Sequence, residues 1–186
     1  MATMVQIANM ALRSIGVKRI TALSDNVESA RVLNDIYTHL RDEMIVIHPW
    51  NFAIKYSSTL AENATDPEFD YDYSYALPTD CLRVIELADA EDKFKVVGGN
   101  LYTDTEDPEI KYIAQITTPA SFSSAFVTAY AARLAAEACY ALTNSRTLEE
   151  QKFKEYTAKL LQAKSVDGQE GVVTKIEESS WVTDRD

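Results

Sequence analysis

The sequence predicts an α+β protein in which a small antiparallel β-sheet is inserted between two pairs of helices and an extended tail follows the second pair. Three observations carry this prediction. Apolar residues recur every three or four positions near both ends of the chain, the middle third holds short aromatic and β-branched runs, and the last stretch is mostly polar. Because neither helix pair can bury an apolar face alone, we expect a four-helix bundle with the sheet against its end or side.

The N-terminal part predicts two amphipathic helices. One covers residues 3–16, where Gly16 supplies a C-terminal stop. The other covers residues 26–48, with Asp25 at its N-terminal cap and Pro49 just beyond its end. The two apolar stripes are Met4, Ile7, Ala8, Ala11, Leu12 and Ile15, and Ala30, Leu33, Ile36, Leu40, Met44 and Ile47.

Residues 50–117 are expected to form the β region. Aromatic and β-branched residues are typical of strands, and their short runs here are separated by polar loops. Gly98 and Gly99 offer the positive backbone angles that a tight hairpin turn requires. This pattern predicts one antiparallel sheet of roughly four to six strands.

The C-terminal part predicts a second helix pair. Residues 119–143 should form a helix that starts at Pro119 and closes at Asn144. Residues 147–166 should form the next helix, opened by a capping box between Thr147 and the acid three positions later. Small residues form a ridge along the first of these helices, which lets another helix approach closely. The ridge consists of Ala125, Ala129, Ala132 and Ala136.

With 186 residues and 46% hydrophobic side chains, the chain has the length of one domain, which we place at residues 1–166. Residues 167–186 form a C-terminal extension whose few apolar side chains cannot make a core. Such a segment is either a disordered end or an extension that orders against a neighbouring protein. We favour the second, with Trp181 as an aromatic anchor and Val173 and Ile176 beside it.

Charge and composition exclude several function classes. The net charge of -11 repels phosphate backbones, so a DNA-gripping role is disfavoured, although a protein that lets DNA pass would tolerate it. The two cysteines, Cys81 and Cys139, follow no metal or disulfide spacing and are expected to be reduced. No membrane-spanning run or signal peptide is evident, which predicts a protein made and kept in a cytosol.

No motif for catalysis, cofactor binding or metal binding stands out. His39 and Glu43 share a helical spacing that a metal could use, but no third ligand accompanies them. The acidic loop 62–72 alternates like the start of a calcium loop. Counted from Asp66, however, the positions for its glycine and its bidentate glutamate hold a tyrosine and a leucine, which favours a solvated loop. The many acids leave a small acidic hydrolase as an alternative.

Tyrosines alternate at the start of one predicted strand. Tyr71, Tyr73 and Tyr75 share one face by the period-two spacing of a strand. No basic residues interleave with them, so a core or a subunit interface is favoured over a base-stacking platform. We therefore include Tyr71 and Tyr73 among the candidate partner-binding residues.

Several pieces, taken in order, resemble the tail tubular protein A family, the head-to-tail adaptors of T7-like tailed bacteriophages. They span nearly the whole chain. The pieces are RSIG at 13–16, HPWNFAI at 48–54, YALPTDCLRVIEL at 75–87, VVGGNLYTD at 96–104 and PASFSSAFVTAYAARLAAEACYALT at 119–143.

This resemblance implies a non-enzymatic virion subunit without cofactors. Such a subunit assembles in the host cytoplasm into a ring, a dodecamer by analogy, between the portal protein and the tail nozzle protein. DNA passes through the ring without specific binding. Another neck or completion connector of a tailed phage is the alternative within the same class.

Overall fold

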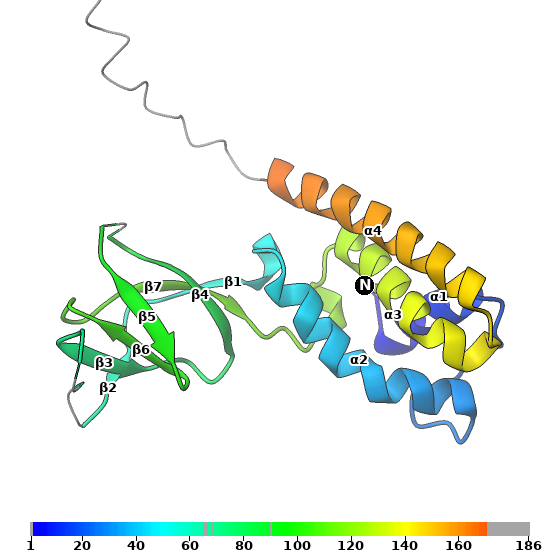
Figure 1. The fold of residues 1–186 in the computed structure, drawn as a ribbon, viewed down its shortest axis with the longest axis horizontal. Coiled ribbons are helices and arrows are strands. Elements are labelled where there is room, and N and C mark those ends of the chain that lie inside the picture. Colours follow the sequence, from blue (N-terminus) through cyan, green and yellow to red (C-terminus); the bar gives the residue numbers. More distant parts are fainter. Residues whose placement is uncertain (1, 65–66, 68, 90, 171–186) are drawn as a thin grey trace, which may run out of the picture.

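The computed structural model describes residues 2–64, 67, 69–89 and 91–170 (Figure 1). The α+β class is confirmed, with four α-helices and two small antiparallel sheets in this part of the chain. The helices gather at one end of the molecule and the sheets at the other (Figure 1). The helices are α1 (Met4–Ser14), α2 (Glu28–Val46), α3 (Ser124–Thr143) and α4 (Arg146–Gln169), with short 3-10 turns η1 (Asn51–Ala53) and η2 (Pro119–Ser121).

The cap predicted for α2 is wrong. Val27 occupies the cap position and makes no side-chain hydrogen bond there. The carboxylate of Asp25 instead accepts from the backbone N–H groups of Thr21 at 2.7 Å and Ala22 at 3.1 Å. These backbone hydrogen bonds lower the pKa of Asp25. Asp25 therefore closes the loop before α2, and a local turn has outcompeted the helix for its side chain.

The starts of α3 and α4 also differ from the prediction, whereas the end of α3 agrees with it. Pro119 opens a 3-10 turn, and α3 begins after Ser123, whose hydroxyl accepts from the N–H three residues on at 3.2 Å. Ser145 caps α4 in the same way at 3.3 Å, so the Thr147 capping box does not form. Asn144 closes α3 in the left-handed region at φ 53°, as predicted.

The β region contains two sheets where one was predicted. One has the order β1-β7-β4, and the other has the order β2-β3-β6-β5. The predicted hairpin turn is confirmed between β5 and β6, where Gly98 and Gly99 have φ of 59° and 84°. The strands are β1 (Ile54–Ser57), β2 (Ala61–Glu62), β3 (Tyr73–Ala76), β4 (Cys81–Leu87), β5 (Phe94–Val97), β6 (Asn100–Thr103) and β7 (Ile110–Ala114).

Side chains of β7 point alternately to the two faces of the three-stranded sheet, and each face packs against a different core. Ile113 points into the large core formed with the helices, whereas Ile110, Tyr112 and Ala114 belong to a smaller core between the two sheets. Ile116, just after the strand, packs against both. The three-stranded sheet is therefore a middle layer with apolar contacts on both faces.

The large core is built around an aromatic group on α3 and the η1 turn. Phe126 is fully buried, and its ring centroid lies 5.1 Å from that of Trp50 and 5.0 Å from those of Phe52 and Phe122. Tyr130 adds a further ring contact at 5.8 Å. This cluster fixes the start of β1 against the helices, because η1 leads directly into that strand.

The alanine ridge of α3 is covered within the chain. Ala129, Ala132 and Ala136 are buried, and α3 contacts α1, α2 and α4. Arg133 lies on the same helix with its guanidinium 5.5 Å from the ring centre of Phe153 and 5.2 Å from that of Tyr156, both on α4. The small residues thus permit close packing between helices of one chain, and only Ala125, at the start of the ridge, is half-buried.

Candidate functional site

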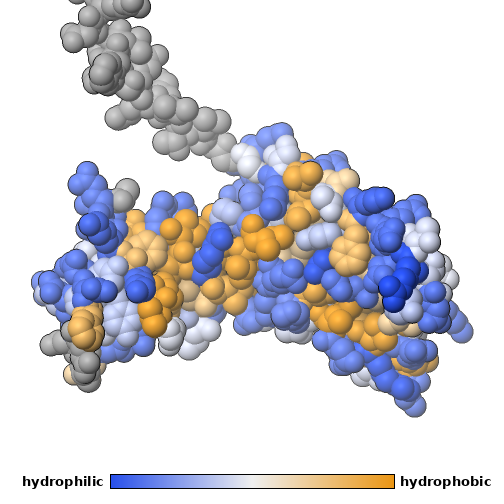
Figure 2. All heavy atoms as spheres, viewed as in Figure 1, coloured by the Kyte–Doolittle hydropathy of each residue, from blue (hydrophilic) through white to orange (hydrophobic). Residues whose placement is uncertain are grey.

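An apolar groove lies where the two sheets meet. Its volume is about 500 Å³. Figure 2 shows hydrophobic side chains gathered over the part of this face where β4 and β5 lie in Figure 1. The apolar lining comes from Leu77, Leu82, Val84, Phe94 and Val96.

The groove exists because two edge strands lie beside it without pairing. β4 ends one sheet and β5 ends the other in the two strand orders. The backbone N–H of Leu77 donates to Gly99 at 3.3 Å, which holds the β5–β6 turn beside the chain that enters β4. Val96 and Val97 are 44% and 49% exposed. Exposed edges with apolar side chains are surfaces on which a further strand can pair.

The charged residues that line the groove are all basic. Arg83 and Lys95 line it, and none of the described acidic residues does. Asp80, next to the lining residue Cys81, is bound by the Lys55 ammonium at 2.6 Å and by the Tyr112 hydroxyl at 3.2 Å. In a chain with a net charge of -11, this groove is a local cationic site.

Cys81 is a poor nucleophile in this setting. Burial, followed by the negative charge of Asp80, raises the pKa of its thiol to about 11. The protonated thiol dominates at neutral pH, and a protonated thiol does not attack. The other cysteine, Cys139, is fully buried. The chemistry available in the groove is therefore binding by apolar contact, backbone pairing and cationic side chains.

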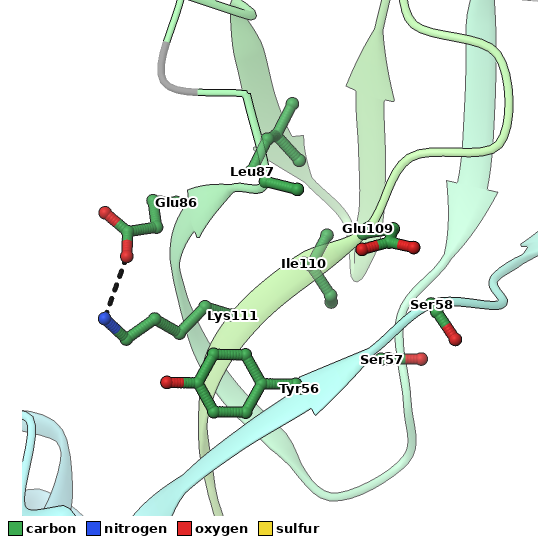
Figure 3. A pocket seen from close by; sticks show the side chains of 9 residues that line it. Tyr56, Ser57, Ser58, Glu86, Leu87, Glu109, Ile110 and Lys111 are labelled. Atoms are coloured by element: carbon green, nitrogen blue, oxygen red, sulfur yellow. Dashed lines mark hydrogen bonds and ion pairs between the residues drawn. The ribbon is translucent and has the colours of Figure 1, made fainter.

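A second hollow of about 440 Å³ lies at the other end of the three-stranded sheet (Figure 3). The Lys111 ammonium donates to Glu86 at 2.8 Å, and this hydrogen bond raises the pKa of Lys111. Glu109 lies on the opposite side of the hollow, near Ser57 and Ser58 (Figure 3). The site thus holds one lysine-bound carboxylate and one separate carboxylate, not the facing pair that general acid–base hydrolysis uses.

The candidate metal residues do not form a centre. His39 is exposed on α2, and Glu43 lies 3.4 Å from Arg133 in an ion pair. Within the described residues, no three metal-ligating side chains come together. Asp66 and Glu68 of the acidic loop lie outside the described residues.

The predicted tyrosine face is turned largely toward the core between the sheets. Tyr75 is 1% exposed, and its hydroxyl accepts from the Asp107 N–H at 3.0 Å. Tyr73 packs against the same core, with its ring centre 6.3 Å from that of Tyr75. Tyr71 is half-buried in the loop before β3 and is not part of a strand. The two-residue spacing of Tyr73 and Tyr75 therefore corresponds to a strand face that packs against the core.

The other predicted partner-binding residues lie outside the described residues: Val173, Ile176 and Trp181. The helix that precedes them, α4, is nevertheless fixed to the rest of the protein near its C-terminal end. α4 continues past the predicted end at 166, because Asp167 is buried and bound to the segment between α2 and β1. The Asp167 carboxylate accepts from the backbone N–H of Asn51 at 3.2 Å and lies 3.2 Å from Nε2 of His48. Residue 167 therefore belongs to the folded body.

His48 also lies within electrostatic reach of the groove. Burial lowers the pKa of His48; the carboxylate of Asp167 opposes this shift, while the positive charges of Lys164 and Arg83 add to it. Arg83 lines the groove. Arg83 is therefore both a lining residue of the groove and one of the charges that act on His48.

Sequence reasoning missed this groove. The run 94–97 was recognisable as a strand, but an edge position depends on which strands pair, and pairing is a long-range property. The one local signal is Lys95 between Phe94 and Val96, since lysine is common on edge strands.

Comparison of the chain with models of known protein families and with curated proteins finds no match. Among the described residues, no helix has the length and apolar content needed to cross a bilayer.

Proposed function

We propose that this chain is a structural adaptor subunit of a phage neck, which forms a ring between the portal protein and the tail nozzle protein. The observation that carries the proposal is the open apolar surface of the β region. The groove and its edge strands expose side chains that an assembled ring would cover. The resemblance of several sequence segments, in order, to the tail tubular protein A family supports this kind of assembly.

Exposed large apolar side chains support an assembly role on both parts of the molecule. Tyr56 on β1 is 75% exposed and Phe69 in the acidic loop is 80% exposed. Leu161 on α4 is 64% exposed. Aromatic residues at such positions are enriched in protein interfaces. In the proposed ring, the helices act as one four-helix bundle that forms the wall, and the β region extends from it toward a neighbouring component.

The charge of the chain supports a channel role. A ring of acidic subunits repels the DNA backbone, so DNA passes through without binding to the wall. The subunit needs no cofactor for this role. Its partners are sister subunits, the portal and the nozzle, and its location is the neck of the virion.

Electron microscopy of the purified chain, alone and mixed with portal rings, tests the proposal. The expected result is a ring that stacks coaxially on the portal. A chain that stays monomeric and does not bind the portal contradicts the proposal. A ring that binds other neck proteins but not the portal indicates a different connector.

The extension provides a sharper test through Trp181→Ala. If Trp181 anchors the extension to a neighbouring protein, this change weakens portal affinity by roughly 2 kcal/mol and leaves the melting temperature unchanged. Unchanged portal affinity removes the anchor role. The matched control is Thr183→Ala, which alters a small polar side chain in the same segment.

A further inference from the structure

A hollow beside α1 combines apolar and cationic groups. This α1 hollow has a volume of about 380 Å³ and lies between the helix and the loop that follows it. The side chain of Asn9 fastens the loop, because its amide donates to the carbonyl of Ile20 at 2.9 Å and its oxygen accepts from the N–H of Ile20 at 2.9 Å. These two hydrogen bonds place Arg19 of the loop on the same lining as Arg13 of the helix.

The charge around the α1 hollow is opposite to that of the whole chain. Residues 1–24 contain Arg13, Lys18 and Arg19 and no acid, so all 29 acids come later in the sequence. Arg13 and Arg19 are exposed, and neither forms an ion pair with a described residue. A cationic hollow of this kind attracts an acidic partner.

The lining of the α1 hollow also suits an aromatic side chain. Ala2 and Met10 contribute apolar groups to it. A cavity of about 150 Å³ already holds a benzene ring, so a hollow of about 380 Å³ has room for a phenyl side chain. Methionine sulfur and arginine guanidinium groups both pack favourably on aromatic rings. The matching occupant is therefore an exposed aromatic residue flanked by acids.

The β end of the chain carries such a residue in the turn just before β3. Phe69 is 80% exposed, and Asp70 and Asp72, both exposed, follow it. Positions 56–82 contain no basic residue that could neutralise these acids locally. We call residues 69–72 the acidic turn.

The acidic turn is held in a defined conformation. The N–H of Tyr71 donates to the carbonyl of Phe69 at 2.9 Å, and the N–H of Asp72 donates to the carboxylate of Asp104 at 3.1 Å. Asp70 lies in the left-handed region at φ 68°, which aspartate tolerates better than most residues. Because the turn is already ordered, presenting the phenyl ring to a partner costs little conformational entropy.

The two surfaces lie at opposite ends of the molecule. α1 belongs to the helical end, whereas the acidic turn leads into β3 at the β end (Figure 1). One copy therefore cannot place its own turn in its own hollow. A contact between two different surfaces of identical chains leaves one of each surface free, so the copies add head to tail into a ring or an open chain.

We propose that the acidic turn of one copy docks in the α1 hollow of the next copy. The ring of Phe69 occupies the hollow. Asp70 and Asp72 lie beside Arg13 and Arg19, where charge-assisted hydrogen bonds fix the orientation. This inference rests on the adaptor proposal, in which sister subunits associate, and it names the two surfaces that join them.

Sedimentation velocity of the full chain and of two surface variants tests the contact. The parent should form species larger than a dimer as its concentration rises, and salt should weaken them. Phe69→Ala removes the aromatic group of the turn and Arg19→Glu reverses a charge of the hollow, so each should weaken self-association by about tenfold or more. Lys154→Glu makes a matched charge change at an exposed site on α4 and should leave self-association unchanged.

A mixture of the two variants identifies the contact as head to tail. The Phe69→Ala copy keeps an intact hollow and the Arg19→Glu copy keeps an intact turn. Their equimolar mixture should therefore form a dimer with the affinity of the parent contact and should grow no further. Both altered side chains are exposed, so the melting temperatures of the variants should match that of the parent.

Four outcomes overturn the inference. The first is a parent that stays monomeric up to about 1 mM, and the second is a parent that stops at a dimer, which indicates a symmetric contact. The third is a mixture of the variants that stays monomeric. The fourth is a DNA duplex that binds the parent but not Arg19→Glu while self-association is unchanged, which assigns the hollow to nucleic acid.

These measurements contain no portal, so the two proposals fail separately. Portal binding by a chain that gives any of the four outcomes leaves the adaptor proposal standing and removes only this contact. Head-to-tail association by a chain that does not bind the portal supports the contact and removes the adaptor role.

Discussion

The helical end and the β end of this molecule differ in how completely they bury their apolar surface. The helical end has a large core, in which Trp50, Phe126 and Leu134 are fully buried. The β end has a small core between two sheets, exposed valines on β5 and two edge strands, β4 and β5, beside an apolar groove. The larger buried core thus lies at the helical end, whereas the apolar groove and its edge strands lie at the β end.

The largest effect expected is on the helical core. Phe126→Ala removes a ring that contacts four other aromatic rings and leaves a cavity in a packed interior, so it should lower the free energy of unfolding by about 3 to 5 kcal/mol. Chemical denaturation measures this. A loss below about 1 kcal/mol would show that the helical core is not the main source of stability.

A smaller loss is expected where the two ends join. Asp167→Ala leaves the N–H of Asn51 and the ring of His48 without their carboxylate partner, so it should cost about 1 to 3 kcal/mol. Thermal or urea melts report the change. Ser165→Ala, at an exposed position on the same helix, is the control and should stay within about 0.5 kcal/mol of the parent.

The same junction predicts a pH dependence. Because the folded chain lowers the pKa of His48 below 6.5, the unfolded chain binds more protons there just below that pH. The contribution of His48 to stability is therefore complete above pH 6.5 and decreases as the pH falls through the folded-state pKa. The groups that face His48 are Asp167, Lys164 and Arg83.

Urea titrations of the parent and of His48→Gln between pH 7.5 and pH 5.5 measure this effect. The parent should lose stability relative to the variant as the pH falls below 6.5. A difference that is constant with pH would mean that His48 has the same pKa in the folded and unfolded chains.

The smallest effect on stability, with a large effect on assembly, is expected at β5. Val96→Asp changes a half-exposed side chain and should shift the free energy of unfolding by less than about 0.5 kcal/mol. It replaces an apolar wall of the groove with a carboxylate that loses its water when a partner covers the groove, so ring formation in electron micrographs should fail. Intact rings from this variant would locate the assembly surface elsewhere on the molecule.

The helices were predictable within a few residues because their apolar stripes repeat locally. The caps were less predictable. Asp25, Pro119 and Thr147 all have suitable side chains, yet Asp25 closes a turn, Pro119 opens a 3-10 turn and Ser145 caps α4 in place of Thr147. Several nearby residues can satisfy the same backbone groups, and the packing of the following helix selects among them.

The α+β class, the order of helices and strands, the glycine hairpin turn and the closure of α3 at Asn144 could be predicted from the sequence, because each depends on local backbone preferences and side-chain periodicity. The number of sheets, the inward orientation of Tyr73 and Tyr75 and the groove between β4 and β5 became evident only from the folded chain. These features depend on which distant strands pair. A strand segment carries the same local preferences in the middle of a sheet and at its edge.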